Sequence, residues 1–197
     1  MNLRIGVAMT AEITRLLSDL VSIRSVNPRL RGASPSDSEQ AAGSYVAQYL
    51  SGYGIDVSFQ EVAPGRNNVI GYVPRGKMAD DRVILLSAHM DTYPASDEEA
   101  MEFQPRVEDG YLVGRGSADA KASLAAMLAG FTASLDSPHR RESYVVASVD
   151  EEYGLCGCQK LCSHSMRPHL AITGEPTSLV PIYAQKRNRS SEYLRFR

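Results

Sequence analysis

The stretch YVVASVDEEYG, residues 144–154, joins an apolar, β-branched segment to three consecutive carboxylates, Asp150, Glu151 and Glu152. Its first half is typical of a strand buried in a sheet. Three adjacent negative charges at the end of such a strand repel one another and resist removal from water. Such carboxylates are stable only if they are solvated, protonated or close to positive charge. Which of these stabilises Asp150, Glu151 and Glu152 bears directly on function.

Apolar segments of the same kind recur along the chain and alternate with amphipathic stretches. Strands are predicted at residues 55–62, 67–74, 82–89, 111–116, 143–149 and 169–173. The third, fifth and sixth of these are continuously apolar, which predicts strands covered on both faces. Helices are predicted from Thr10 to the Asn27–Pro28 pair, from Ser36 or Asp37 to Gly52, from Asp119 to just before Pro138, and around Gln159. The alternation is typical of an α/β domain with helices on both faces of a mostly parallel sheet.

The composition narrows the possible classes of function. The 197 residues are 43% hydrophobic and 22% charged, with a net charge of −2, which is ordinary for one globular domain. This balance gives no reason to expect binding to nucleic acid or to a membrane surface. The first residues lack the apolar stretch of a secretory signal. The cysteines, Cys156, Cys158 and Cys162, are clustered and odd in number, so we expect reduced thiols in a cytoplasmic protein.

Three of the predicted strands end in residues that can bind metal ions, and the strongest helix begins with another such residue. The four places are His89 with Asp91, Asp150 to Glu152, Glu175, and Asp119. In open α/β sheets, ligands bind just beyond the carboxyl ends of the strands. We therefore expect these side chains, which are far apart in the sequence, to meet at one edge of the sheet.

Each residue of this set also has an ordinary structural explanation. A single histidine at a strand end is usually structural, a run of acids is usually a solvated turn, and Asp119 could cap a helix. Coincidence of all four is much less common. Divalent cations would explain the whole set, because they neutralise carboxylates that otherwise need protons. One histidine with several carboxylates favours zinc, with cobalt or manganese also suitable and magnesium less so.

Five segments together resemble the cocatalytic dizinc family of metallopeptidases and deacylases. They are LLSDLVSIRSVNP (16–28), SAHMDTYP (87–94), GRGSADAKASLAAML (114–128), DEEYG (150–154) and GEPTSL (174–179). The family includes acetylornithine deacetylase, succinyl-diaminopimelate desuccinylase, aminoacylase and glutamate carboxypeptidase. A single HxD motif is a weak signal, whereas the ordered set with these spacings is a strong one.

The resemblance implies a zinc-exopeptidase-like catalytic domain that hydrolyses amide bonds in N-acyl amino acids or small peptides. It implies two Zn²⁺ ions, for which Co²⁺ could substitute. In the roles that the resemblance implies, His89 and Glu175 bind the first ion, Glu152 binds the second, and Asp119 bridges the two. Glu151 is the implied general base, and Asp91 is implied to orient His89. The extended segment from His89 to Asp91 independently puts both side chains on one side, as that last role requires. A cis peptide bond is also expected between Asp119 and Ala120.

The same resemblance makes the end of the chain unusual. Family members continue past GEPT into a lid or dimerisation domain and then return to the catalytic sheet with a last histidine ligand. The resemblance here ends near Ala184, and residues 185–197 form an atypical, arginine-rich tail. We therefore expect residues 10–184 to be the N-terminal part of the catalytic domain, with the lid and its dimer surface absent. A frameshift or premature stop would explain such an ending.

Two other functions remain open at this point. The chain could be a catalytically inactive metal-binding remnant, or an interaction fragment that pairs through an exposed sheet edge. The cysteines could form a metal site with His164, but their spacing does not match structural zinc sites, and buried or reduced thiols are favoured. His139, His164 and His169 are predicted to be loop or surface residues.

Overall fold

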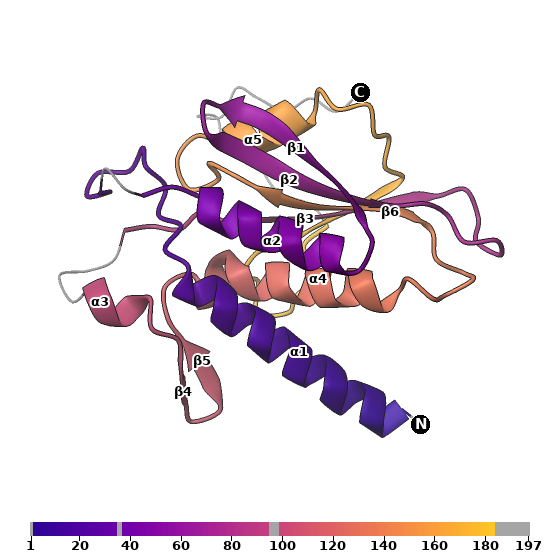
Figure 1. The fold of residues 1–197 in the computed structure, drawn as a ribbon, viewed down its shortest axis with the longest axis horizontal. Coiled ribbons are helices and arrows are strands. Elements are labelled where there is room, and N and C mark those ends of the chain that lie inside the picture. The colour runs from indigo at the N-terminus through magenta and orange to yellow at the C-terminus, as the bar shows by residue number, and fades with distance from the viewer. Residues whose placement is uncertain (1, 35–36, 95–98, 184–197) are drawn as a thin grey trace.

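A five-stranded sheet forms the centre of the fold in the computed structural model, which describes residues 2–34, 37–94 and 99–183 (Figure 1). Its strands lie in the order β1-β2-β6-β3-β7. Their bounds are Asp56–Ala63 for β1, Arg66–Val73 for β2, Val83–His89 for β3, Glu142–Ser148 for β6 and Leu170–Thr173 for β7. Each strand overlaps a segment that the sequence predicts to be a strand.

The sheet is mixed, which corrects the prediction of a mostly parallel one. β3 pairs with β6 and β7 in parallel, whereas β2 pairs with β1 and β6 in antiparallel fashion. The antiparallel pairing of β1 with β2 follows from their connection, in which only Pro64 and Gly65 intervene. A parallel crossover needs a dozen or more residues, so such a short link imposes a hairpin. The α/β class itself is confirmed.

Helices cover both faces of the sheet, as predicted (Figure 1). On one face lie α2 (Gln40–Gly52) and α4 (Ala122–Ala133), and α1 (Asn2–Ser22) packs on α4. The opposite face carries α5 (Cys156–Leu161). Among the described residues, no helix is long and apolar enough to cross a membrane.

Two helices begin at residues other than those predicted. Thr10 lies inside α1, not at its start. The helix α2 starts at Gln40 and receives no cap from Asp37, because the carboxylate of Asp37 pairs with Arg24 and accepts the Ser34 backbone N–H at 2.6 Å. Their predicted amphipathic character is nonetheless confirmed, since Leu16 and Leu20 of α1 and Val46 and Leu50 of α2 are buried.

Successive residues of β6 belong to two separate apolar clusters, one on each face of the sheet. Val145 and Ala147 belong to the large core beneath α2 and α4, whereas Val146 packs with Ile70 and Met166 on the face of α5. This two-sided burial explains why the segment reads as continuously apolar rather than alternating.

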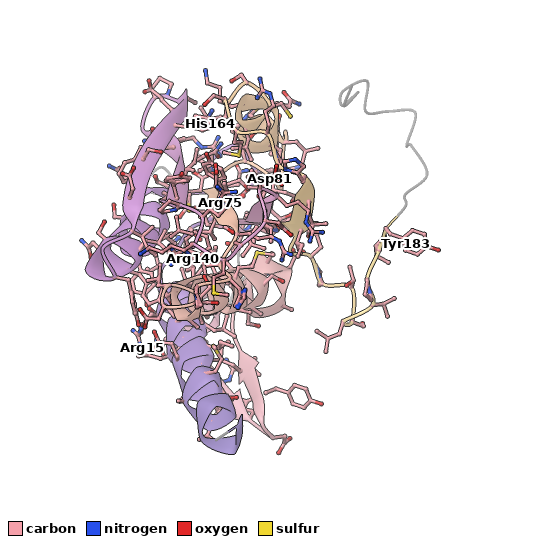
Figure 2. All side chains as sticks on the ribbon, turned by 90° about the vertical axis from the view of Figure 1, so that its right-hand side faces the viewer. Arg15, Arg75, Asp81, Arg140, His164 and Tyr183 are labelled. Atoms are coloured by element: carbon pink, nitrogen blue, oxygen red, sulfur yellow. The ribbon has the colours of Figure 1, made fainter. Side chains whose placement is uncertain are left out.

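The last strand, β7, is exposed, and the prediction that it is buried was wrong. It lies at the edge of the sheet, and Leu170 and Ile172 are 54% and 47% exposed. In Figure 2, Tyr183, which ends the described chain and is 98% exposed, stands apart from the rest of the fold. An apolar run predicts a strand, but it does not determine whether other elements cover that strand. The predicted tail, 185–197, lies outside the described residues.

A second, two-stranded sheet lies beside the ends of α1 and α4 (Figure 1). It pairs β4 (Arg106–Glu108) with β5 (Tyr111–Val113), and β5 lies within the strand predicted at residues 111–116. A short helix, α3 (Glu99–Glu102), precedes it in a segment for which the sequence predicted neither a helix nor a strand. After β5 comes the irregular turn η1 (Ser117–Lys121), which leads into α4.

Candidate metal centre

The parallel register between β3 and β6 brings two of the predicted ligand segments together. His89, the last residue of β3, pairs with Ser148 at the end of β6, so the turn that follows β6 lies next to His89. The turn η1 supplies Asp119. His89, Asp119 and Glu152 each offer a ligand atom, and these atoms all lie within 4.8 Å of one another.

Asp119 sits in an irregular backbone segment. Its φ and ψ of −119° and 96° are not helical, so it is not the helix cap that its position would also allow. The peptide bond between Asp119 and Ala120 is cis, as expected. Two residues later, the buried ammonium of Lys121 donates hydrogen bonds to the carbonyls of Leu20 at 2.8 Å and Ile23 at 2.9 Å. Lys121 thereby ties this turn to the end of α1.

The imidazole of His89 is held from both sides. It is 2% exposed, and its Nδ1 lies 2.9 Å from the backbone carbonyl oxygen of Asp91. Because a carbonyl can only accept, Nδ1 carries a proton, and Nε2 faces the Asp119 carboxylate at 3.0 Å. The Asp91 carboxylate lies farther from Nδ1, at 3.6 Å. The contact at hydrogen-bonding distance is thus made by the backbone of Asp91.

The Asp91 carboxylate instead contacts the turn after β6. It accepts the backbone N–H groups of Glu151 and Glu152, both at 3.1 Å, and the side-chain amide of Asn27 at 2.7 Å. Asp91 therefore fixes His89 through its backbone carbonyl. Through its side chain it also fixes the turn that carries Glu151 and Glu152, called the acidic turn below.

Glu151 and Glu152 occupy different positions although they are adjacent. Glu152 belongs to the three-residue set, whereas the Glu151 carboxylate lies outside it, 3.9 Å from His89 Nε2. Burial is the largest cause that raises the pKa of Glu151, and the charges of Asp91 and Asp119 add to it. The pKa of Glu152 is raised to about 7, again first by burial.

The electrostatics of the cluster fit a divalent cation. Burial alone would lower the pKa of His89, but the neighbouring Asp91, Asp119 and Glu151 raise it to about 10. The negative charge of these carboxylates is thus partly balanced by a proton on His89. A divalent ion would provide more positive charge while using the same nitrogen and oxygen atoms as ligands.

Glu175 lies near the cluster but outside the three-residue set. It follows β7, which pairs in parallel with β3, and it is half-buried. Burial raises its pKa first, opposed by His89, and the charges of Glu151 and Asp119 raise it further. Its carboxylate is therefore within the electrostatic field of the same site.

Asp150 is the residue of the acidic run that does not belong to the cluster. It is fully buried, and its carboxylate pairs with Arg29 and Arg66, each at 3.0 Å. Burial would raise its pKa, but hydrogen bonds from Cys156 and Asn27 and the charge of Arg66 keep the pKa below its ordinary value. The three adjacent acids are therefore neutralised in two different ways.

A cavity of about 280 Å³ opens beside the cluster. Besides Asp119 and Glu152, it is lined by Thr92, Tyr93 and residues 114–118. Sequence reasoning did not identify these as site residues, although several of them flank predicted ligands in the motifs SAHMDTYP and GRGSADAK. It also missed Asn27 and Arg66, whose partners lie far away in the sequence.

The other candidate ligands form no metal set among the residues that the structure describes. Cys156, Cys158 and Cys162 are free thiols. The ring nitrogens Nδ1 of His164 and His169 accept backbone N–H groups, and His139 is exposed.

Comparison with known proteins agrees with this geometry. Residues 85–184 match the peptidase family M20/M25/M40. Over 89% of its length the chain is 30% identical to acetylornithine deacetylase from Vibrio vulnificus and 31% identical to a probable succinyl-diaminopimelate desuccinylase from Staphylococcus epidermidis. It spans 45% and 42% of these relatives.

A solved structure shares the fold. A metallo-carboxypeptidase of the M20 family from Sulfolobus solfataricus superposes with a TM-score of 0.68, at 16% identity, over 83% of this chain and 37% of its own. The fold, the convergence of His89, Asp119 and Glu152, and the match over residues 85–184 together identify this chain as a member of the peptidase family M20/M25/M40.

Proposed function

We propose that this chain carries the catalytic face of a metal-dependent hydrolase that cleaves amide bonds in N-acyl amino acids or small peptides. The observation that carries the proposal is the convergence of His89, Asp119 and Glu152 from three separate segments onto one point. The names of the relatives, a deacetylase and a desuccinylase, support the substrate class.

Two metal ions would be held by residues of this cluster. His89 and Glu175 would bind one, Glu152 the other, and Asp119 both. Such ions, when bound, polarise an amide carbonyl and lower the pKa of a water molecule toward neutrality. Zinc is our first choice, because the set combines an imidazole nitrogen with carboxylates, and cobalt or manganese would also fit.

Glu151 would move the proton. Its carboxylate is beside the three-residue set but not in it, so it remains free to accept a proton from the attacking water. The same proton then passes to the nitrogen of the leaving amine as the C–N bond breaks. A pKa raised by burial suits this role, since it brings the carboxyl closer to the pH at which it must both take and give a proton.

A second candidate is a domain that binds metal without turnover. It is favoured by the composition of the cluster, which among the described residues contains a single histidine. In that case the Glu152 ion would bind more weakly than the His89 ion, and hydrolysis would be absent.

The test combines metal analysis with hydrolysis of N-acetyl and N-succinyl amino acids and dipeptides. Glu151→Gln should retain the metal and lose at least about 100-fold in rate, as expected for a general base. His89→Ala should lose metal. The exposed residues Glu61 and His139 provide the controls Glu61→Gln and His139→Ala, which should change neither property.

The outcomes separate the candidates. Metal with hydrolysis that depends on Glu151 supports the hydrolase, and metal without hydrolysis supports the second candidate. If His89→Ala binds as much zinc as the unmodified chain, neither proposal holds.

A further inference from the structure

Arg66, the first residue of β2, lies behind the acidic turn and contributes nothing to the ligand set. Its side chain is 11% exposed, and its guanidinium has three partners. Nε donates to the Glu39 carboxylate at 2.9 Å, Nη2 to the Asn27 side-chain oxygen at 3.3 Å, and Nη1 pairs with Asp150 at 3.0 Å. Glu39, Asn27 and Asp150 are all buried, so the contacts with Arg66 replace hydrogen bonds to water. Arg29 supports two of them as well, since its backbone N–H donates to the Asn27 side-chain oxygen and its guanidinium pairs with Asp150, both at 3.0 Å.

Two of these partners hold the turn that carries Glu151 and Glu152. Asp150 begins the turn with a φ of 64°, and its carbonyl accepts the N–H groups of Gly154 at 3.2 Å and Leu155 at 2.6 Å. A left-handed residue other than glycine needs such support from its surroundings.

Asn27 reaches the same turn by another route. Its side-chain amide donates to Asp150 at 3.1 Å and to the Asp91 carboxylate at 2.7 Å, and Asp91 in turn accepts the N–H groups of Glu151 and Glu152. Arg66 therefore contacts both residues that hold the acidic turn in place, Asp150 and Asn27.

We propose that Arg66 is a positioning residue for the metal centre, acting through Asn27 and Asp150 to fix the carboxylates of Glu151 and Glu152. The proposal rests on the proposed function, because it assigns the turn to a metal site. Arginine suits the position because its planar guanidinium can serve several acceptors in fixed directions, which a lysine ammonium cannot do to the same extent.

The chain contains a matched control for this arginine. Arg24 pairs with the buried carboxylate of Asp37, just as Arg66 pairs with that of Glu39, and both acids lie within three residues of the start of α2. Its side chain is 30% exposed, and its guanidinium donates to both carboxylate oxygens of Asp37 and lies 5.1 Å from the ring centroid of Phe103. Arg24→Met therefore removes a comparable ion pair without removing the contacts of Arg66 to Asn27 and Asp150.

The experiment titrates the metal-free protein with Co²⁺ and follows the visible absorption of the bound ion. Arg66→Met should weaken Co²⁺ binding by about 10- to 100-fold, which is typical for loss of a group that orients ligands, and should alter the spectrum. Arg66→Lys should recover part of the affinity. Arg24→Met should match the unmodified chain. Equal affinity and spectra for Arg66→Met and the unmodified chain, or equal losses in both methionine variants, would overturn the proposal.

A second measurement needs no metal. Hydrogen exchange at the Glu151 and Glu152 amides should accelerate in Arg66→Met and not in Arg24→Met, and unchanged exchange would count against the proposal. If Arg66→Met does not fold, Asp150→Asn takes its place with the same expectations. Failure of the unmodified chain to bind Co²⁺ would overturn the proposed function, whereas normal binding by Arg66→Met would overturn only the role of Arg66.

Discussion

Residues 150–152 show how adjacent like charges can share one turn. Asp150 is paired with two arginines in the interior, while Glu151 and Glu152 lie around the imidazole of His89. The sequence predicted that the acids gather with His89 and Asp119, because strand ends converge in this type of sheet. It did not predict the separate fate of Asp150, since its partners Arg29 and Arg66 lie in segments that no motif connects to it.

Asp91 illustrates the same limit at the level of single atoms. Its position two residues after His89 predicted that it would orient the imidazole. It does contact Nδ1, but through its carbonyl, while its carboxylate accepts the amides of the acidic turn. Residue spacing indicates which side chains are neighbours, whereas the choice between backbone and side-chain oxygen depends on the local backbone path.

Metal affinity should rise with pH, because protons compete with the ion for His89 and Glu152. In the metal-free chain the pKa of His89 is raised to about 10 by the surrounding carboxylates, against the effect of burial, and that of Glu152 is raised to about 7, mainly by burial. Below these values each group holds a proton that the ion must displace. Zinc calorimetry from about pH 6 to about pH 9, in buffers of different ionisation heat, should detect at least about one proton released per chain. The control His139→Ala should behave identically. Binding without proton release would contradict the assignment of His89 as a ligand.

At the scale of elements, the local sequence pattern predicted which segments are strands and helices. It predicted less well how the strands pair and which of them are buried. All six predicted strands were found, and so was the two-sided burial of β6. The exposure of β7 and the antiparallel half of the sheet were missed. Both depend on which elements become neighbours, and hydrophobic periodicity within a segment carries no information on that.

Gly71 on β2 should be a sensitive point of the packing between sheet and helix. A Cβ added there would lie 2.9 Å from Leu50 of α2 and 3.0 Å from Val145 of β6. Gly71→Ala should therefore lower the free energy of unfolding by about 1–3 kcal/mol, as overpacking does. Gly130 in α4 has open space around it, and Gly130→Ala should raise that free energy by up to about 1 kcal/mol through helix propensity. Urea denaturation of both variants tests the pair. A neutral Gly71→Ala would contradict rigid packing of Leu50 and Val145 around this glycine.

At the scale of the whole molecule, the site is assembled where the parallel half of the sheet meets the ends of α1 and η1. The segment after α1 runs beside the segment after β3, with hydrogen bonds of 3.0 Å between Asn27 and Thr92 and between Thr92 and Ser25. This contact brings Asn27 to the acidic turn, and Lys121 joins the turn of Asp119 to the same helix end. The cluster therefore depends on the packing of α1 as well as on the sheet.

Metal ions are proposed to hold the acidic strand ends together. Crystals grown with Zn²⁺ and measured on both sides of the zinc absorption edge would locate any bound ion by its anomalous signal. We predict a peak bonded to His89 Nε2 and Asp119, and a second one between Asp119 and Glu152. Well-ordered side chains of His89, Asp119 and Glu152 with no anomalous peak among them would contradict the account.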